Sequence, residues 1–355
     1  MLPVTHESLH LAAALNNTFP YTMKRNRDDD VAVTGDEEGV RRPAKHHRPT
    51  EGVATNAHLV AQHYNARPEV GRDRRKDSPI LHLKNFNNWI KSILISKYAH
   101  RGFHVMDFCC GKGGDLLKWS KAGIRHLVGV DIAAVSIEQA QERYSQGRGN
   151  RFQATFFAAD CFEVSISDKL PPGHKLDLVS CQFALHYSFE SEAKARIGLE
   201  NITKSLKHGG HFIGTIPNAY WIVKRLRATD ALSFGNSILT VAFDQRDDYP
   251  VFGHKYWFEL KDAIDNCPEY LLHFPTFEKL ASEYGLELEY KKPFHEIFQE
   301  ESQNEQYQNL LYRMNVVNDE GTISADEWEV AGGYMLVHAV STLNTVSDAA
   351  LSLDI

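Results

Sequence analysis

The sequence lacks several features that would point to particular protein classes. Its five cysteines are scattered and odd in number, and no pair has the spacing of a zinc site or a redox motif. We therefore expect reduced thiols, a cytosolic or nuclear compartment and no bound metal. Lys and Arg together number 39 against 46 Asp and Glu, a net charge of -7. Many nucleic-acid-binding domains are strongly basic, so any polyanion site here must be a local patch.

Long apolar runs are absent as well. No stretch approaches the ~20 residues that a membrane span needs. The first residues lack the basic start, apolar core and cleavage site of a secretory leader, so we expect neither a span nor a leader. The chain has 355 residues, of which 43% are hydrophobic and 24% charged. That composition is typical of a globular protein with one large domain or two smaller ones.

Residues 1–54 are predicted to form a disordered, charged tail. They carry basic clusters at Lys24–Arg27 and Arg41–Arg48, an acidic run at Asp28–Asp30 and no sustained hydrophobic period. Too little apolar surface is present to offset the entropy of ordering. The basic clusters are consistent either with a nuclear import signal, which would place the protein in the nucleus, or with a merely solvated tail. Residues 343–355 are predicted to form a C-terminal tail.

From residue 105 onward, short apolar runs alternate with helix-like segments. We expect strands at 105–108, 126–130, 154–159, 176–181 and 211–216. Helices are expected at 84–98, 115–122, 136–144 (capped by Ser136) and 197–206 (closed by Gly209 and Gly210), after an earlier one at 58–64. This alternation predicts an α/β fold with a mostly parallel sheet covered by helices on both faces. Ligands of such folds bind at the carboxyl ends of the strands.

The second half of the chain departs from this alternation. Residues 219–272 are rich in aromatics without a clean period, so we interpret them as an insertion that shapes a substrate pocket. After the insertion we expect a helix at 277–284, a strand at 286–290, a polar helix at 299–314 and a last strand at 334–340. This last strand could run antiparallel to the others. These two strands complete a seven-stranded sheet, and the predicted domain spans residues 55–342.

A glycine loop follows the first of these strands. Asp107 ends the strand, Gly111, Gly113 and Gly114 follow, and a helix begins near Asp115. Glycines let backbone amides approach a ligand closely, and a helix start favours anionic groups. Two cations, Lys112 and Lys118, lie in or beside the loop. The loop is therefore expected to hold a nucleotide-type cofactor while its lysines meet a second, anionic ligand.

Nicotinamide and S-adenosylmethionine both suit a glycine loop with an acidic residue after the next strand, here Asp131. Three details favour S-adenosylmethionine. A carboxylate at Asp107 suits a zwitterionic methionine tail better than a pyrophosphate. The loop is a poor match to G-x-G-x-x-G, and Asp160 ends the third strand, where it can bond an adenine amino group. The alternative is that these aspartates only cap helices.

Several longer blocks carry a resemblance to a known family. They are His63–Arg67, Asn85–Lys91, Gly111–Lys118, Ser180–Glu190, Phe212–Asn218 and Tyr249–Tyr256. In this order and over about residues 55–340, the chain resembles the eukaryotic mRNA cap guanine-N7 methyltransferases. The resemblance implies a Rossmann-like class I S-adenosylmethionine-dependent methyltransferase fold. It also implies transfer of a methyl group from S-adenosylmethionine to N7 of the terminal guanosine of 5'-capped (GpppN) RNA, with other capping enzymes as possible partners.

By motif match, the resemblance implies two sets of site residues. The cofactor would contact Lys91, Asp107, Cys109, Gly111, Asp115, Asp131, Asp160, Gln182 and Tyr187, Asp115 by supporting the loop. The cap would contact Asn87, Asn88, Lys112, Lys118, Arg143, His186, Tyr256, Phe258, Glu269 and Tyr334. The implied roles of His186, Tyr187 and Glu269 are to position the reactants in line.

The side-chain chemistry fits these roles. Guanine N7 has a lone pair and no proton, so the reaction needs orientation rather than a general base or a metal. Glu269 can accept the N1 and N2 hydrogens of guanine, a pattern that adenine does not offer. The local sequence alone would make Glu269 a surface residue at a helix start, the basic residues solvated helix charges and the aromatics core. The asparagines would then be caps and His186 structural.

Cys109 departs from the family, which usually has glycine there. If its φ is positive, strain of order 1–3 kcal/mol is expected. This substitution motivates a second hypothesis, a cap-binding protein that has lost catalysis. A third hypothesis, a methyltransferase acting on a small metabolite, is disfavoured by the basic residues around the loop.

Overall fold

The computed structural model describes residues 56–66, 77–147, 152–170, 175–318 and 320–342. The predicted tails, residues 1–54 and 343–355, lie outside these ranges. Within them, the core is a seven-stranded sheet in the order β10-β11-β5-β4-β1-β2-β3. Its strands are β1 (His104–Phe108), β2 (His126–Asp131), β3 (Gln153–Ala158), β4 (Leu176–Gln182), β5 (Leu206–Pro217), β10 (Leu286–Pro293) and β11 (Tyr334–Ser341).

The sheet has the predicted mixed direction. Strands β1 to β5 pair in parallel, and their registers align Met106 with Val128 on one side and with Val179 on the other. β11 is inserted antiparallel between β5 and β10, which confirms the seven strands and settles the direction of the last one. Residues of β1 and β2 are almost wholly buried, as expected for parallel strands with both faces covered.

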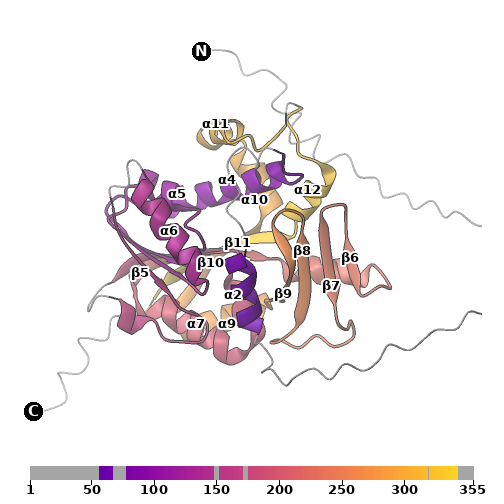
Figure 1. Cartoon of the computed structure of the whole chain (residues 1–355), viewed down its shortest axis with the longest axis horizontal. Coiled ribbons are helices and arrows are strands. Elements are labelled where there is room, and N and C mark those ends of the chain that lie inside the picture. Colours follow the sequence, from indigo (N-terminus) through magenta and orange to yellow (C-terminus); the bar gives the residue numbers. More distant parts are fainter. Residues whose placement is uncertain (1–55, 67–76, 148–151, 171–174, 319, 343–355) are drawn as a thin grey trace, which may run out of the picture. The chain divides into compact units, whose positions relative to one another are not determined.

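Helices cover both faces of the sheet (Figure 1). On one face lie α4 (Leu81–Tyr98), α5 (Leu116–Ala122), α6 (Ala134–Gln146) and α10 (Phe294–Glu301), and on the other α7 (Glu192–Lys204) and α9 (Phe274–Glu283). The predicted stripe of α4, which includes Phe86 and Trp89, is fully buried. The predicted helix at 58–64 is α2 (Asn56–Ala66), which contacts α6 and strand β9 (Ile264–Tyr270). None of the helices in the described ranges has both the length and the apolar character that crossing a membrane requires.

The segment interpreted as an insertion contains regular structure. It folds as α8 (Ala219–Arg227) and a four-stranded antiparallel sheet of β6 (Ser233–Gly235), β7 (Leu239–Phe243), β8 (Lys255–Leu260) and β9 (Ile264–Tyr270). The hydrophobic pattern of the sequence did not predict these strands. In β9, with sequence IDNCPEY, a carboxylate is buried beside apolar residues, so the strand has no regular alternation of polar and apolar residues. The sheet appears at the right of Figure 1.

Three local predictions were wrong. Helix α6 starts after Ala133 rather than at Ser136, because the Asp131 carboxylate accepts the Ala133 N–H (2.9 Å) and fixes the turn earlier. Gly209 and Gly210 lie within β5 and do not close a helix. The polar helix at 299–314 is two helices, α10 and α11 (Glu305–Arg313), because the Asn304 side chain accepts the Gln306 N–H and starts a new helix. The described ranges also contain α12 (Ala325–Ala331) and the short η1 (Ser167–Lys169) and η2 (Leu185–Glu190).

Candidate functional site: a cavity at the carboxyl edge of the sheet

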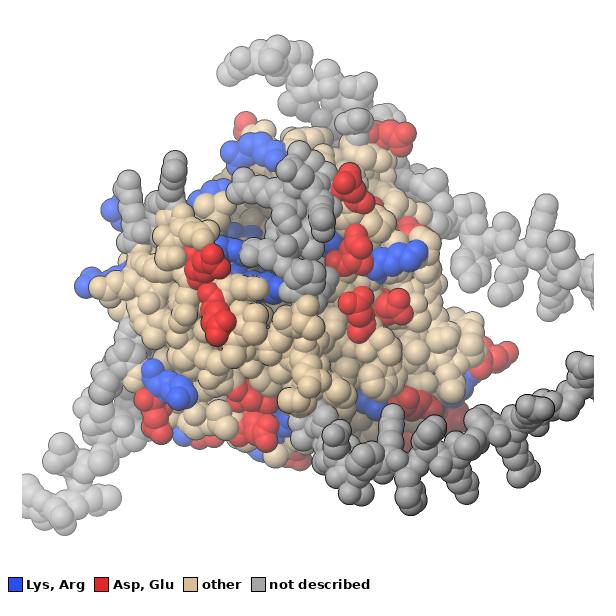
Figure 2. Space-filling model, viewed as in Figure 1, with Lys and Arg blue, Asp and Glu red and all other residues tan. Residues whose placement is uncertain are grey.

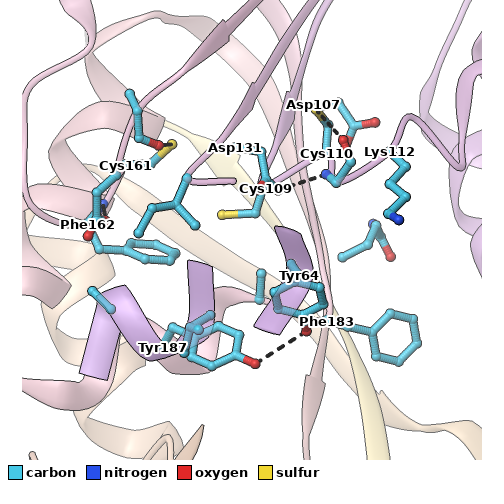
Figure 3. Close-up of a pocket in the computed structure, with 18 of the residues that line it drawn as sticks. Tyr64, Asp107, Cys109, Cys110, Lys112, Asp131, Cys161, Phe162, Phe183 and Tyr187 are labelled. Atoms are coloured by element: carbon cyan, nitrogen blue, oxygen red, sulfur yellow. Dashed lines mark hydrogen bonds between the residues drawn. The ribbon is translucent and has the colours of Figure 1, made fainter. Parts of the chain in front are cut away.

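A cavity of about 420 Å³ lies where β1, β2 and β4 end. Its size is within the ordinary range for a small-molecule site. All residues predicted to contact the cofactor line it: Lys91, Asp107, Cys109, Gly111, Asp115, Asp131, Asp160, Gln182 and Tyr187. Figure 3 shows Asp107, Cys109 and Asp131 on one side of it and Tyr64 and Tyr187 on the other. The sequence thus located these side chains, and the fold brings them to one cavity.

Asp131 joins the cavity to the glycine loop. Its Oδ2 accepts the Gly111 N–H at 2.8 Å and its Oδ1 accepts the Ala133 N–H at 2.9 Å. A carboxylate oxygen has two lone pairs, so each oxygen keeps an acceptor site for ribose hydroxyls. Gly111 has a φ of 52°, a conformation that glycine adopts without strain. Asp131 therefore bonds both the glycine loop and the turn that leads into α6, a helix that has no side-chain cap hydrogen bond at its first turn.

The other two strand-end carboxylates are also held in place. The Trp119 indole donates a hydrogen bond to Asp107 Oδ2 at 3.1 Å, and Asp107 is only 4% exposed. Asp160 accepts the Phe162 N–H at 3.0 Å, a local turn contact. Neither bond caps a helix. Both side chains line the cavity, where each carboxyl group can accept hydrogen bonds from a ligand.

Asp115 links the predicted cofactor side to the predicted cap side. Lys91 Nζ lies 2.9 Å and Lys118 Nζ 2.7 Å from its Oδ1, and Lys118 also donates to Asn88 Oδ1 at 3.1 Å. Burial raises the pKa of Asp115, but the two ammonium groups outweigh it and hold that pKa at about 2. Asp115 is the residue before α5 yet makes no side-chain cap hydrogen bond. It therefore works as the anion that orders two lysines.

The pKa values of two cavity carboxyls are raised. Burial, and next the neighbouring Asp115 charge, raise the pKa of Asp107 to about 7. Burial, and next Cys109, raise the pKa of Asp131 to about 7 against the hydrogen bonds from Ala133 and Gly111. In both cases the ionised form is the one suited to a cation or to ribose hydroxyls. A ligand that needs both carboxylates must displace protons to bind at or below neutral pH.

Ligand affinity should therefore depend on pH in a defined direction. The ionised forms are lost as pH falls through about 7, so S-adenosylhomocysteine should bind more weakly below that value and reach a plateau above it. One displaced proton corresponds to about tenfold in Kd per pH unit. Calorimetry between pH 6 and pH 8.5, in two buffers of different ionisation enthalpy, measures both the Kd and the released protons. An affinity independent of pH, with the circular dichroism spectrum also constant, would contradict this assignment.

Cys109 has a positive φ of 63°, so its backbone has the strained conformation that the sequence alone could not decide. A side chain in this left-handed region costs about 1–2 kcal/mol relative to glycine. We expect Cys109→Gly to be more stable than Cys109→Ala by about 1 kcal/mol, because both variants lack the thiol but only glycine relieves the backbone. Urea unfolding of the two variants gives this difference in the free energy of unfolding. Equal stabilities would show that the loop carries no strain.

The predicted guanine-binding residues form a second, buried group. Glu269 lies in β9 at 3% exposure, so the surface interpretation is wrong. Tyr256, its register partner in β8, donates a 2.6 Å hydrogen bond to Glu269 Oε2, and His186 Nε2 lies 3.5 Å from the same oxygen. Apart from this carboxylate contact, neither ring nitrogen of His186 has a hydrogen-bond partner among the described residues, although His186 is only 2% exposed. Buried polar atoms without partners are rare, and a bound ligand is one explanation.

This buried group adjoins the cavity through aromatic side chains. The rings of His186 and Tyr187 are 4.3 Å apart, and Tyr334 packs edge-on against Phe183 at 5.3 Å. Tyr187 and Phe183 both line the cavity. Phe258 lies two residues after Tyr256 on the same face of β8. Tyr256, Phe258 and Tyr334 are buried and do not line the cavity, so they pack behind its wall.

The predicted phosphate-binding residues are only partly brought together. Lys112 and Arg143 line the cavity, whereas Lys118 lies behind it, held by Asp115 and Asn88. Figure 2 shows Lys and Arg side chains at the hollow in the middle of this face, with Asp and Glu on the surface around it. The Asn87 Oδ1 is buried and has no hydrogen-bond partner in the described part of the chain. Neither Asn87 nor Asn88 lines the cavity.

Sequence reasoning missed the wall that α2 provides. Tyr64 lines the cavity, and its hydroxyl lies 3.4 Å from that of Tyr187. Asn56, at the start of α2, donates to Glu190 Oε1 at 3.2 Å and to the Tyr270 hydroxyl at 2.7 Å. These bonds connect α2 to η2 and β9. Tyr64 belongs to the block His63–Arg67, one of those that carry the family resemblance. Nothing else in the sequence indicated that it lines the cavity.

Comparison with known proteins agrees with this geometry. A family model described as the mRNA (guanine-N(7))-methyltransferase domain matches residues 47–341. The mRNA cap guanine-N(7) methyltransferase of Schizosaccharomyces pombe is 47% identical over 289 residues, 78% of this chain and 80% of the relative. The mRNA cap guanine-N(7) methyltransferase 1 of Oryza sativa is 45% identical over 79% of this chain and 80% of its own length.

A relative from Cryptococcus neoformans, also named mRNA cap guanine-N(7) methyltransferase, is 48% identical over 288 residues. The match covers 78% of this chain but 46% of the relative, so this chain spans about half the length of that protein. The family model and the relatives from Schizosaccharomyces and Oryza cover most of the fold described above. The chain belongs to the mRNA cap guanine-N7 methyltransferase family.

Proposed function

We propose that this protein transfers a methyl group from S-adenosylmethionine to N7 of the terminal guanosine of 5'-capped RNA. The observation that carries the proposal is the pair of adjoining sites in a chain of this family. Carboxylates suited to a sulfonium amino acid and its nucleoside line one cavity, and a buried glutamate with a hydrogen-bond-free histidine lies directly behind its aromatic wall.

The cavity fits the proposed cofactor by its donor and acceptor set. Asp107 is an anion site for an amino group, Asp131 offers acceptors to two vicinal hydroxyls, and Asp160 offers an acceptor to an exocyclic amine. Bound S-adenosylmethionine supplies an activated methyl group on a sulfonium. We assign its binding to Lys91, Asp107, Cys109, Gly111, Asp115, Asp131, Asp160, Gln182 and Tyr187.

The chain's own residues then orient the acceptor. Glu269 accepts hydrogens of the guanine edge while Tyr256 holds that carboxylate, and His186 offers an unused ring nitrogen. Guanine N7 carries a free lone pair, so no residue has to remove a proton. Good orientation supplies roughly 7–11 kcal/mol of barrier reduction in such reactions. Lys112 and Arg143 place positive charge at the cavity for the phosphate bridge, supported by Lys118.

The direct test uses labelled S-adenosylmethionine with GpppA-capped RNA and identifies the methylated atom after nuclease digestion. Label on guanine N7 supports the proposal. Cap binding with no transfer and no measurable affinity for S-adenosylhomocysteine would favour a cap-binding protein that has lost catalysis, the hypothesis that strained Cys109 motivates. Transfer that cap analogues and GTP do not inhibit would favour a small-metabolite enzyme.

Domain limits and location belong to the same proposal. We propose that residues 55–342 form the methyltransferase domain, that 219–272 are its substrate-side insertion and that 1–54 and 343–355 are tails. The basic clusters in residues 1–54 would direct the protein to the nucleus. A fusion of residues 1–54 to a fluorescent protein tests this, with both clusters changed to alanine as the control.

A further inference from the structure

Three cysteines gather at one end of the cavity. They are Cys109 and Cys161, which line the cavity, and Cys181. All three are free thiols. Cys181 is in β4 opposite Phe108, the residue before Cys109, and paired strands lie about 4.8 Å apart. In Figure 3 the Cys109 sulfur points from its loop to the side of the cavity where Cys161 lies. The family position that usually holds glycine thus places a thiol beside two others.

The three thiols do not have equal reactivity. Side-chain contacts with Cys161, and next with Cys181, lower the pKa of Cys109 to about 5, which favours its thiolate at neutral pH, while the Cys161 thiol donates to the Ala159 carbonyl oxygen at 3.7 Å. The same contact with Cys109 is the main reason that the pKa values of Cys161 and Cys181 are raised well above the usual value. Thiolates are the nucleophilic form and the form that peroxides oxidise. Cys109 is also only partly buried and is open to the cavity.

Cys161 is the better placed partner for a second step. Both thiols are buried, but Cys161 lines the cavity and begins the turn that follows β3, whereas Cys181 lies within the central strand β4. A disulfide has a narrow preferred geometry, so the backbone near the two thiols must adjust when the bond forms. A turn accommodates such an adjustment more readily than a central strand with hydrogen-bonded neighbours on both sides.

We propose that Cys109 and Cys161 form a peroxide-sensitive pair that closes the cofactor cavity when oxidised. The Cys109 thiolate attacks one oxygen of hydrogen peroxide, the O–O bond breaks, and Cys109 sulfenic acid and water result after proton uptake. The Cys161 sulfur then attacks the Cys109 sulfur, the S–O bond breaks, and a disulfide and a second water are released. Peroxide gains the two electrons that the thiols lose, and a dithiol reductant reverses the change.

The expected consequence is loss of ligand binding. This part of the inference rests on the proposed cofactor cavity, because Cys109 lies in the loop between Asp107 and Gly111 that we assign to S-adenosylmethionine. A bond from Cys109 to Cys161 joins that loop to the turn after β3 across the cavity. A bound cofactor would in turn cover the Cys109 thiolate and slow its oxidation.

The test treats the reduced full-length protein with hydrogen peroxide, with and without saturating S-adenosylhomocysteine. Tryptic mass spectrometry should find a Cys109–Cys161 cross-link carrying two hydrogens fewer than the reduced peptides. Calorimetry should show at least a tenfold weaker Kd for S-adenosylhomocysteine, restored by dithiothreitol, and prior ligand should protect both. The cross-link and the binding are measured without methyl transfer, so failure of the proposed reaction would not obscure the result.

Two variants provide the comparison. Cys161→Ser should form no cross-link and should accumulate a trappable sulfenic acid at Cys109. Cys110→Ser is the matched control, because burial raises the pKa of that neighbouring, partly buried thiol well above the usual value, and it should respond like the unchanged protein. A Cys109 that stays unmodified at peroxide levels that oxidise a free-thiol peptide would overturn the proposal. So would a cross-linked protein with unchanged ligand affinity.

Discussion

Asp131→Ala should reduce the affinity for S-adenosylhomocysteine by about 10²–10⁴-fold. Hydrogen bonds to a charged group contribute about 1.5–3 kcal/mol each, and the two predicted ribose bonds therefore account for about 3–6 kcal/mol. The Asp131 carboxylate also accepts hydrogen bonds from the Gly111 and Ala133 amides and so holds the glycine loop against β2. The substitution removes this acceptor. Calorimetry with S-adenosylhomocysteine alone measures the effect without any contribution from RNA.

Two further variants separate the ligand from the fold. Asp168→Ala changes an exposed carboxylate in η1 and should leave the affinity unchanged. Asp131→Asn keeps one acceptor oxygen and should lose less affinity than the alanine variant. If Asp131→Ala binds like the unchanged protein, the ribose assignment is wrong. If Asp131→Ala, but not Asp131→Asn, also loses much thermal stability, the loss of affinity would instead result from a disordered glycine loop.

The framework of the fold followed from the sequence because its signals are local. Strands such as β1 and β2 are short, mostly apolar runs, and each carries an aspartate at its last or next-to-last position, at the edge where ligands gather. Their alternation with helices fixes a parallel sheet with little further information. The cofactor residues line one cavity for the same reason, since the carboxyl ends of parallel strands meet at one edge.

The substrate side could not be read in the same way. Glu269 becomes buried only because β9 pairs with β8 and brings Tyr256 to its carboxylate, a tertiary event with no local pattern. The pairing of Lys118 with Asp115 and Asn88, contributed by α4 and the glycine loop, is likewise invisible in sequence. The positive φ of Cys109 was a conditional expectation, and only backbone geometry decided it.

Glu269→Gln should lower kcat/KM for GpppA-capped RNA by about 10²–10³-fold, mainly through KM. A carboxylate accepts both the N1 and the N2 hydrogens of guanine, whereas an amide presents one acceptor and one donor, so one bond becomes a donor–donor clash. Losing such a bond and leaving a buried polar group unpaired costs about 3–4 kcal/mol. Glu259→Gln, an exposed position on the neighbouring β8, is the control and should behave like the unchanged protein.

Guanine selectivity gives the sharper readout, because it isolates the base contact from general damage. Inosine lacks the N2 amino group, so the unchanged protein should prefer GpppA to IpppA, and Glu269→Gln should narrow that preference. Tyr256→Phe removes the hydroxyl that orients the carboxylate and should cost about tenfold in kcat/KM while the preference for guanine persists. Should Glu269→Gln retain the full discrimination, the base is read elsewhere, and the hydrogen-bond-free ring of His186 becomes the candidate reader.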